Sequence, residues 1–483
     1  MIKYMITNFY VKQALLMIMI CLSLNTYSQS TFNINIGTQE DESFPVIELL
    51  NDSYILLYNI QPTETDENNK ISVDYINKLG DKNNIHLFSS DTCDFIFGNI
   101  IRYENSFFIH GLQKHIDSTF YRHWLFKMDE DLSIVWQKTY DSPFDGYFFE
   151  TEMAFYNNHL IVASSNFINN NTASQFLRFN MDGNLVHQKT YNSNYWEYIR
   201  DLLIIDNSDA EIFYAFGQGF DLVNPSRLTL NEEFDIIDEK NTYVLNEQDA
   251  EWISDTSFVL CGSVHENDTT FMISQILDTN LNVYSEALFK HPSSWNQHVA
   301  AFNSLDLINN DYIYLGGTTH LAPMFTQYPN YVMLNKLDLS FNIEWQKFIG
   351  GDAQYILYSI KTTPDGGCIM AGSRYDWNTQ YNERDIFVMK VDENGLITSV
   401  EGEDFQVADA IVYPNPGSNK LQIQSAFPLK EIRMMDVNGR MVLQQPLNYL
   451  MDEINVNPLN AGTYIYQIIG RDDEIQHGKW MKM

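Results

Sequence analysis

The segment IKTTPDGGCIMAGS, residues 360–373, contains the pattern that decides the fold. Apolar residues lead into the polar turn TPDGG, and a second apolar run ends in the small residues AGS. Two such runs around a Gly-containing turn predict a β-hairpin of half-buried strands. Related hairpins are expected at 49–59, 102–111, 155–165, 202–219, 253–263 and 307–318.

A second kind of hairpin lies between these. WLFKMDEDLSIVWQKTYDS (124–142) and YVMLNKLDLSFNIEWQKFIGG (331–351) each place an acidic or Asn-rich turn between two alternating runs, and Trp-Gln-Lys follows. Further copies span 71–90, 176–193, 227–243, 271–289 and 386–400. Their first turn residues recur about every 50 residues. We assign them to Gly80, Asp129, Asp182, Asn231, Asp278, Asp338 and Asp392.

Two hairpins per unit make four strands, and seven units predict an all-β, seven-bladed β-propeller over residues 31–400. Radial packing would bury both faces of each blade and leave only short edges. An array of β-sandwiches or an open solenoid is the alternative. The blades can be sequential in the chain, or the last hairpin can pair with the first to close the ring, and the pattern is compatible with both.

The composition limits the kinds of molecule that the protein can bind. The net charge of −34 argues against nucleic acid and anionic membrane surfaces, which would repel the chain. The 14% aromatic content favours strands. Divalent cations remain as ligands, yet the turns DEDLS and DENG lack the Glu that would complete a calcium loop. We therefore expect no cofactor, with Ca²⁺ as the weak alternative.

The repeats are similar to those of secreted bacterial propeller proteins. PDGGCIMAGS (364–373) and MKVDENGLITS (389–399) carry the resemblance, which covers about residues 44–400. It implies the propeller fold and implies no cofactor site.

Residues 1–28 differ from the rest of the chain. Lys3 and Lys12 precede an apolar core from Ala14 to Leu24, which is followed by a polar exit. This order predicts a secretory signal peptide, cut near Ser28. Lipidation at Cys21 is the alternative, although bulky residues precede that cysteine. No other stretch is apolar enough to cross a membrane.

Removal of the signal peptide leaves three cysteines, Cys93, Cys261 and Cys368. An odd number excludes a complete disulfide framework, and each cysteine lies in or beside an apolar run. We expect small buried side chains, while one disulfide and one free thiol remain possible in an exported protein.

The acidic stretch 401–410 has no clear strand pattern and suits a linker. Residues 411–483 then return to short strands and predict a small, Ig-like β-sandwich. IVYPNP (411–416), DVNGR (436–440), LNAGTYIYQI (459–468) and the terminal GKWMKM follow one another in this segment. In order and spacing they resemble the C-terminal sorting domain of type A cargo of the type IX secretion system in Gram-negative bacteria.

That resemblance implies export by the signal peptide and then transport across the outer membrane by the type IX machinery. The tail would be removed, and the remainder released or tethered to surface lipopolysaccharide. The resemblance marks these motif residues: Pro414, Asn415, Pro416, Asn438, Gly439, Gly462, Thr463, Tyr464, Lys479 and Lys482. Each glycine can also be explained as a simple turn residue.

No catalytic motif stands out. The sequence has no HExxH, G-x-S-x-G, P-loop or dinucleotide fingerprint. His110 and His115 lie near a predicted strand end, where we expect them to be solvated. Glu150 and Glu152 alternate to one face of a predicted strand and are the one candidate pair of catalytic carboxyl groups.

Two main functions remain. The first is a non-enzymatic surface protein that binds glycan or protein through aromatic loops carrying Tyr195, Trp196, Trp295 and Trp377, although these rings can also pack between blades. The second is a secreted polysaccharide hydrolase or lyase with acids near the central channel. Convergent acids with perturbed pKa values would favour the enzyme, and a flat aromatic rim would favour binding. We favour binding, because no unit carries polar residues that break the repeat in a concerted way. A passive scaffold is a third interpretation.

Overall fold

The computed structural model describes residues 30–62, 68–142, 150–168, 171–192, 198–207, 210–218, 226–266, 269–290, 296–309, 311–321, 325–380, 383–397, 407–408, 410–413, 417–425, 429–436, 439–447, 451–470 and 475–482. The regular elements in these ranges are strands, and no helix there is long and apolar enough to span a bilayer.

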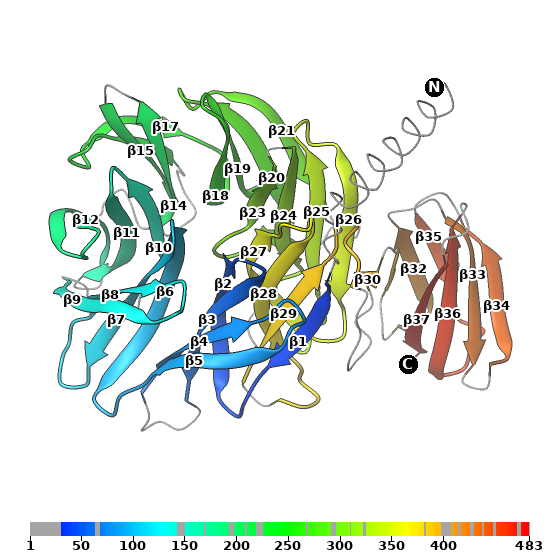
Figure 1. Ribbon diagram of the computed structural model, residues 1–483. Coiled ribbons are helices and arrows are strands. Elements are labelled where there is room, and N and C mark those ends of the chain that lie inside the picture. Colours follow the sequence, from blue (N-terminus) through cyan, green and yellow to red (C-terminus); the bar gives the residue numbers. More distant parts are fainter. Residues whose placement is uncertain are drawn as a thin grey trace, which may run out of the picture.

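Most of the chain forms a ring of antiparallel sheets, which Figure 1 shows from one face. The first sheet contains β2 (Asp41–Leu50), β3 (Ser53–Gln61), β4 (Lys70–Ile76) and β5 (Lys82–Phe88). The second contains β6 (Cys93–Tyr103), β7 (Ser106–His115), β8 (Arg122–Asp129) and β9 (Ile134–Asp141). The third contains β10 (Glu150–Tyr156), β11 (His159–Ile168), β12 (Asn171–Asn180) and β13 (Leu185–Asn192).

Two further sheets continue in the same order along the chain. The fourth contains β14 (Tyr198–Asn207), β15 (Ala210–Gln218), β16 (Ser226–Leu230) and β17 (Ile236–Asn241). The fifth contains β18 (Leu245–Ser254), β19 (Ser257–Glu266), β20 (Thr269–Asp278) and β21 (Val283–Phe289).

The sixth sheet has an interrupted inner edge. Both β22 (Gln297–Val299) and β23 (Leu305–Ile308) pair with β24 (Tyr312–Thr319), which is followed by β25 (Tyr331–Asp338) and β26 (Ile343–Gly350). A two-residue strand, β30 (Val407–Ala408), pairs with the outer side of β26. The stretch expected as a linker therefore contributes one short strand to this sheet, and residues 401–406 lie outside the described ranges.

The seventh sheet joins the two ends of the ring. It contains β27 (Gln354–Thr362), β28 (Cys368–Tyr375) and β29 (Asp385–Val391), and its outermost strand is β1 (Phe32–Ile36). The register pairs Phe32 with Lys390 and Ile36 with Ile386. The first strand of the ring thus completes the last sheet, which settles the closure that the repeats left open. The fold is a β-propeller, and seven sheets among the described residues are compatible with the seven expected blades.

A buried ion pair reinforces the closure. Arg384, just before β29, donates from its Nε to Oδ1 of Asp41 at the start of β2 (2.7 Å), and its backbone N–H donates to the same oxygen (2.9 Å). Both residues are less than a tenth exposed. The backbone N–H of Glu42 in turn donates to the carbonyl of Arg384 (2.9 Å). The last and first blades are therefore joined by charge as well as by strand pairing.

The turns between third and fourth strands share one construction. Oδ1 of Asp129 accepts a hydrogen bond from the backbone N–H of Ser133 (2.9 Å), and Leu132 has a φ of 61°. The equivalent anchors are Asn77, Asn180, Asn231, Asp278, Asp338 and Asp392. An Asp or Asn side chain that accepts backbone N–H groups stabilises such a turn. The assignments to Gly80 and Asp182 were wrong, because Asn77 and Asn180 earlier in the same turns hold that position.

The outer strand of the preceding blade packs on several of these turns. A Cβ on Gly183 would come within 2.6 Å of the Trp136 ring on β9, and one on Gly395 within 3.0 Å of the Trp345 ring on β26. The Nε1 of Trp345 donates to the carbonyl of Glu393 in that turn (3.0 Å). The Trp of the repeated Trp-Gln-Lys therefore packs on a glycine in the turn of the next repeat.

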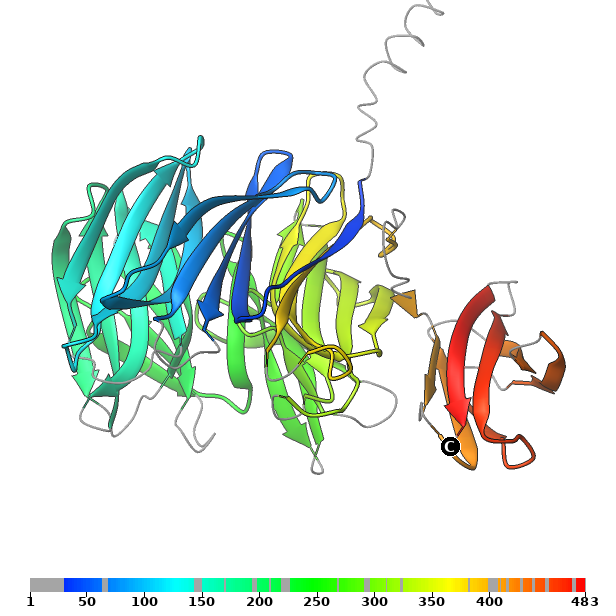
Figure 2. The ribbon, with the colours of Figure 1, turned by 90° about the horizontal axis from the view of Figure 1, so that it is seen from below.

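The tail is a two-sheet sandwich, drawn in orange to red in Figure 2 as a body separate from the ring. One sheet contains β31 (Ala410–Tyr413), β32 (Lys420–Ser425) and β35 (Met451–Asn455). The other contains β33 (Leu429–Asp436), β34 (Met441–Pro446), β36 (Gly462–Gly470) and β37 (Ile475–Lys482). Leu421 and Ile454 of the first sheet share one core with Ile432, Ile468 and Trp480 of the second.

Replacing Gly183 by Ala should destabilise the protein more than the same change at Gly439. The two glycines have similar φ values of 76° and 78°, which costs other residues about 1–2 kcal/mol. Only Gly183 faces a ring, since nothing lies within 4 Å of a Cβ at Gly439. We expect a further loss of ~1–3 kcal/mol in the free energy of unfolding at Gly183, measured by urea denaturation, because Trp136 must move. Equal losses at the two glycines would contradict this contact.

Candidate functional site

The ring has two distinct faces. In each antiparallel blade, the innermost strand starts at one face, which we call the entry face, and ends at the other, which we call the turn face. The links from second to third strand, and from one blade to the next, lie at the entry face. The turns from first to second and from third to fourth strand lie at the turn face.

Of the four predicted ligand-stacking aromatics, the structure describes Trp377, which is half-buried in the turn between β28 and β29 at the entry face. Tyr195, Trp196 and Trp295 lie outside the described residues.

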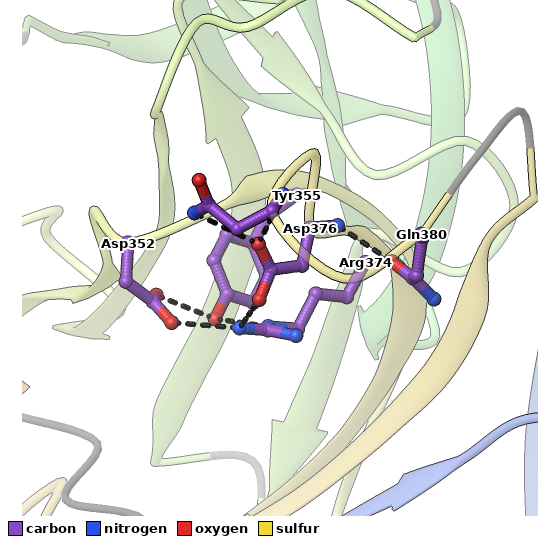
Figure 3. Close-up of polar contacts among 6 residues, drawn as sticks. Asp352, Tyr355, Arg374, Asp376 and Gln380 are labelled. Atoms are coloured by element: carbon purple, nitrogen blue, oxygen red, sulfur yellow. Dashed lines mark hydrogen bonds and ion pairs between the residues drawn. The ribbon is translucent and has the colours of Figure 1, made fainter.

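The loop that carries Trp377 is fixed by a buried cation (Figure 3). Arg374 is 6% exposed, and its Nη2 lies 2.9 Å from Oδ2 of Asp352 and 3.3 Å from Oδ2 of Asp376. Its Nε donates to the Tyr355 hydroxyl (3.1 Å), which donates to Oδ1 of Asp352 (2.8 Å). The Gln380 side chain accepts from the Asp376 backbone N–H (2.6 Å). Because these groups bind one another, we interpret the cluster as support for the loop.

A polar cavity of about 460 Å³ lies at the centre of the ring. In Figure 1 the inner strands β2, β6, β10, β14, β18 and β27 face one another around this centre. The lining comes mainly from the later half of each inner strand, so the cavity lies toward the turn face. Its chemically distinctive residues are Glu48, Asn99, Glu152, Asp201, Asp249, Glu251, Trp252, Asn303 and Lys361.

Several of these side chains bind the backbone of a neighbouring inner strand. Oδ2 of Asp249 accepts hydrogen bonds from the backbone N–H groups of Ser304 (2.8 Å) and Leu305 (3.0 Å). Nδ2 of Asn99 donates to the carbonyl of Thr151 (3.0 Å) and to Oε2 of Glu152 (3.2 Å). These bonds join adjacent blades and fix the side chains toward the axis of the ring.

The carboxyl groups of the cavity are strongly perturbed. Burial, together with the charges of Asp201 and Asp249, raises the pKa of Glu152 well above its usual range. Burial and Asp201 also raise the pKa of Asp249, although backbone hydrogen bonds and Lys361 oppose the change. Burial raises the pKa of Glu251 to about 8, against the opposing effect of Lys361. Part of this cluster is therefore protonated at neutral pH.

Lys361 is the only positively charged side chain among the described residues that line the cavity. Burial lowers its pKa, but Glu48, Asp306, Glu251 and Asp249 together raise that pKa above its usual value. Lys361 is therefore charged and partly balances the acids on its side of the cavity.

Sequence reasoning missed most of this site. Glu152 was considered only with Glu150, whose side chain lies outside the described residues. The expectation that no polar residue breaks the repeat in a concerted way is wrong. Asn99, Glu152, Asp201 and Asp249 occupy successive inner strands of four blades and meet at the cavity. A polar residue shortly before the apolar run of each inner strand was the available signal.

The expectation for His110 is also wrong. It lies within β7 and is fully buried, with its Nε2 at 2.9 Å from Nδ1 of His123. Nε2 of His123 lies 2.8 Å from Oε1 of Gln175, and burial lowers the pKa of His123 to about 4. The two rings are therefore a neutral, buried pair. His115 is exposed, as expected.

Cysteine and metal chemistry have no site among the described residues. Cys261 and Cys368 are buried, Cys93 is partly buried, and all three are free thiols. Within the same ranges, no group of three or more His, Cys, Asp or Glu side chains is placed to hold a metal ion.

The structure describes some of the sorting-motif residues in the tail and not others. Pro414, Asn415, Pro416 and Asn438 lie outside the described residues. Gly439 and Gly462 lie in or beside turns, and Tyr464 is buried with its ring 6.1 Å from that of Trp480.

The two terminal lysines and Thr463 are placed differently. Lys479 is exposed, whereas Nζ of Lys482 donates to the carbonyl of Val456 (2.6 Å). A concave surface of about 570 Å³ joins Asp436 and Arg440 to Gly462, Thr463 and Tyr464.

The comparison with family models identifies the tail. Residues 411–481 match the model described as a secretion system C-terminal sorting domain. The tail is therefore a type IX sorting domain, and it marks the chain for export to the cell surface or extracellular space of a Gram-negative bacterium. No curated relative matches the chain.

Several solved structures are similar to the chain at low identity. PorZ, a surface component of the type IX secretion system of Porphyromonas gingivalis, is 10% identical with a TM-score of 0.28, over 95% of this chain and 87% of that one. The β-propeller domain of the Trilobed protease from Pyrococcus furiosus is 10% identical with a TM-score of 0.40, over 74% and 99%. The polysaccharide lyase Uly1 is 8% identical with a TM-score of 0.42, over 76% and 100%.

The raised pKa of Glu251 gives a testable pH dependence. An acid with a higher pKa in the folded than in the unfolded state makes the protein less stable as the pH rises between the two values. We expect the free energy of unfolding to fall between pH 4.5 and about 8, and to fall less in Glu251→Gln. Glu344→Gln, on the exposed part of β26, is the matched control and should leave the slope unchanged. Identical slopes for Glu251→Gln and the wild type would contradict this assignment.

Proposed function

We propose that this exported β-propeller is a glycan-binding protein and that the central cavity holds the ligand. The observation that carries the proposal is the convergence of carboxyl groups, Asn99, Asn303 and the Trp252 ring on one cavity of about 460 Å³. Carboxylates and amides form hydrogen bonds with sugar hydroxyls, and an aromatic ring offers an apolar face for a sugar ring. The volume is in the range of small-ligand sites.

A protein ligand fits this cavity less well. A stable protein–protein contact buries about 800 Å² on each partner, which calls for a broad surface. The size of the cavity therefore favours a glycan.

A polysaccharide hydrolase or lyase is the second candidate. The convergent acids with raised pKa values favour it, as expected of an enzyme. Glu251 in particular keeps its proton at neutral pH because burial raises its pKa to about 8. A protonated carboxyl group is what a general acid of glycoside cleavage requires. Release of new reducing ends from a bound polysaccharide, lost in Glu251→Gln, would establish the enzyme.

A matched pair of tryptophan variants tests which face binds. The cavity proposal predicts that Trp252→Leu weakens glycan binding at least tenfold, because the stacking surface is lost, whereas Trp377→Leu at the entry face has little effect. Glycan arrays followed by calorimetry on the full chain provide the measurement. The Nε1 of Trp252 donates to the carbonyl of Ile204 (2.9 Å), so the unfolding free energy of each variant must be compared first. Loss of binding in Trp377→Leu alone would place the ligand at the entry face.

For the tail, we propose removal after transport, with the remainder released or tethered to surface lipopolysaccharide. The concave surface of Asp436, Arg440, Gly462, Thr463 and Tyr464 joins two of the sorting motifs. This adjacency supports a role for these residues in contact with the type IX machinery. Lys479 is exposed and available for the same role, whereas the contact of Lys482 with Val456 supports a role in folding.

The mature protein from its native producer should have a mass that matches a chain from about Gln29 to about residue 410. This result is expected because the signal peptide is cut near Ser28 and the tail is removed after it has been read. Cell fractionation with intact-mass measurement tests both ends. A periplasmic product that still contains Met483 would contradict the removal of the tail.

A further inference from the structure

The carboxyl group of Glu152 in the cavity has an oxygen without a hydrogen bond. Glu152 is 8% exposed, and its Oε2 accepts from Nδ2 of Asn99 (3.2 Å). Its Oε1 is buried and has no hydrogen-bond partner. A buried, unsatisfied acceptor costs about 1–3 kcal/mol, and more when it is charged. A ligand that brings a donor to this oxygen would remove that cost.

The charges around the cavity are distributed unevenly. Five carboxyl groups line it, from Glu48, Glu152, Asp201, Asp249 and Glu251. Lys361 interacts with Asp249, Glu251 and Glu48, and with Asp306 behind them. It is not among the groups that shift the pKa of Glu152, which instead senses the negative charges of Asp201 and Asp249. Lys361 therefore offsets the charge of Asp249 but not that of Glu152.

Taking the proposed glycan-binding function as its basis, we propose that the ligand is an amino sugar whose free ammonium group binds beside Glu152. An ammonium group combines a positive charge with three hydrogen-bond donors, as the unsatisfied Oε1 and the neighbouring acids require. A bare metal ion suits the site less, because no metal-holding group of side chains is present among the described residues. Trp252 lines the same cavity and offers its ring to the rest of the sugar.

Ligand binding should then be coupled to proton release. Burial and mutual repulsion raise the pKa of Glu152 and Asp249, so these acids hold their protons more strongly than free carboxyl groups do. An arriving ammonium group favours the ionised carboxylates and expels protons into the buffer. Glu48, Glu251, Asp306 and Lys361 face the same cluster from β2, β18, β23 and β27.

The experiment uses the full chain and three oligosaccharides of equal length, composed of glucosamine, N-acetylglucosamine or glucose. Calorimetry in two buffers of different ionisation enthalpy gives both the affinity and the protons released. We expect the glucosamine oligomer to bind at least tenfold more tightly than the other two, with net proton release at pH 7. Acetylation removes the charge and leaves the rest of the sugar intact, so the comparison isolates the ammonium group.

Two variants separate the charge of the ligand from the shape of the site. Glu152→Gln should abolish the preference for glucosamine, whereas Lys361→Met should retain or strengthen it, because a repelling cation is removed. Glu344→Gln is the matched surface control. Weaker binding in Lys361→Met would instead indicate an anionic sugar and overturn the inference. Circular dichroism and unfolding curves establish that each variant is folded.

The inference and the proposed function fail in different ways. Equal binding of the three oligomers, or binding of only neutral or acidic glycans on an array, would refute the ammonium preference and leave a glycan-binding cavity in place. Absence of binding to every glycan on the array would refute both.

Discussion

Contact between neighbouring blades is the constraint on which the rest of the structure depends. At the rim, the outer strand of one blade packs on the turn of the next, as Trp136 does on Gly183. At the axis, polar side chains bind across the same boundary, as Asp249 does to Ser304 and Leu305. Each sheet has two apolar faces and cannot bury them alone, so each requires both neighbours. The last boundary is completed by β1 and by the buried pair of Arg384 and Asp41.

The candidate site arises from the same construction. Residues that join inner strands must be polar, and their position in a ring directs them toward a common axis. Asn99 and Asp249 use polar atoms for the backbone of the neighbouring blade. Glu152 differs from these two, because one of its oxygens is bound by Asn99 and the other is left unsatisfied. A residue that serves packing alone would be expected to satisfy both oxygens, and this is why the cavity is more than a by-product of the ring.

The sequence predicted the β-propeller, the two hairpin types and the sorting tail, because these depend on local patterns. Alternation of apolar and polar residues indicates which face of a strand is buried, and Asp or Asn at a turn indicates a local hydrogen bond. Gly80 and Asp182 were nevertheless mistaken for the anchors Asn77 and Asn180. The cavity depends on residues about 50 positions apart that meet only when the ring closes. Asn99, Glu152, Asp201 and Asp249 each look like an ordinary polar residue in one strand. His110 was misjudged for a related reason, since His123 on the adjacent strand allows it to be buried.

The position of β1 has a consequence for the order of events during folding. Phe32 pairs with Lys390, so β1 must wait for nearly the whole ring before its partner arrives. Until then its edge is open to any other strand, and folding is slowed by the long loop that must close. A chain built in this way completes its ring only when its last blade is present.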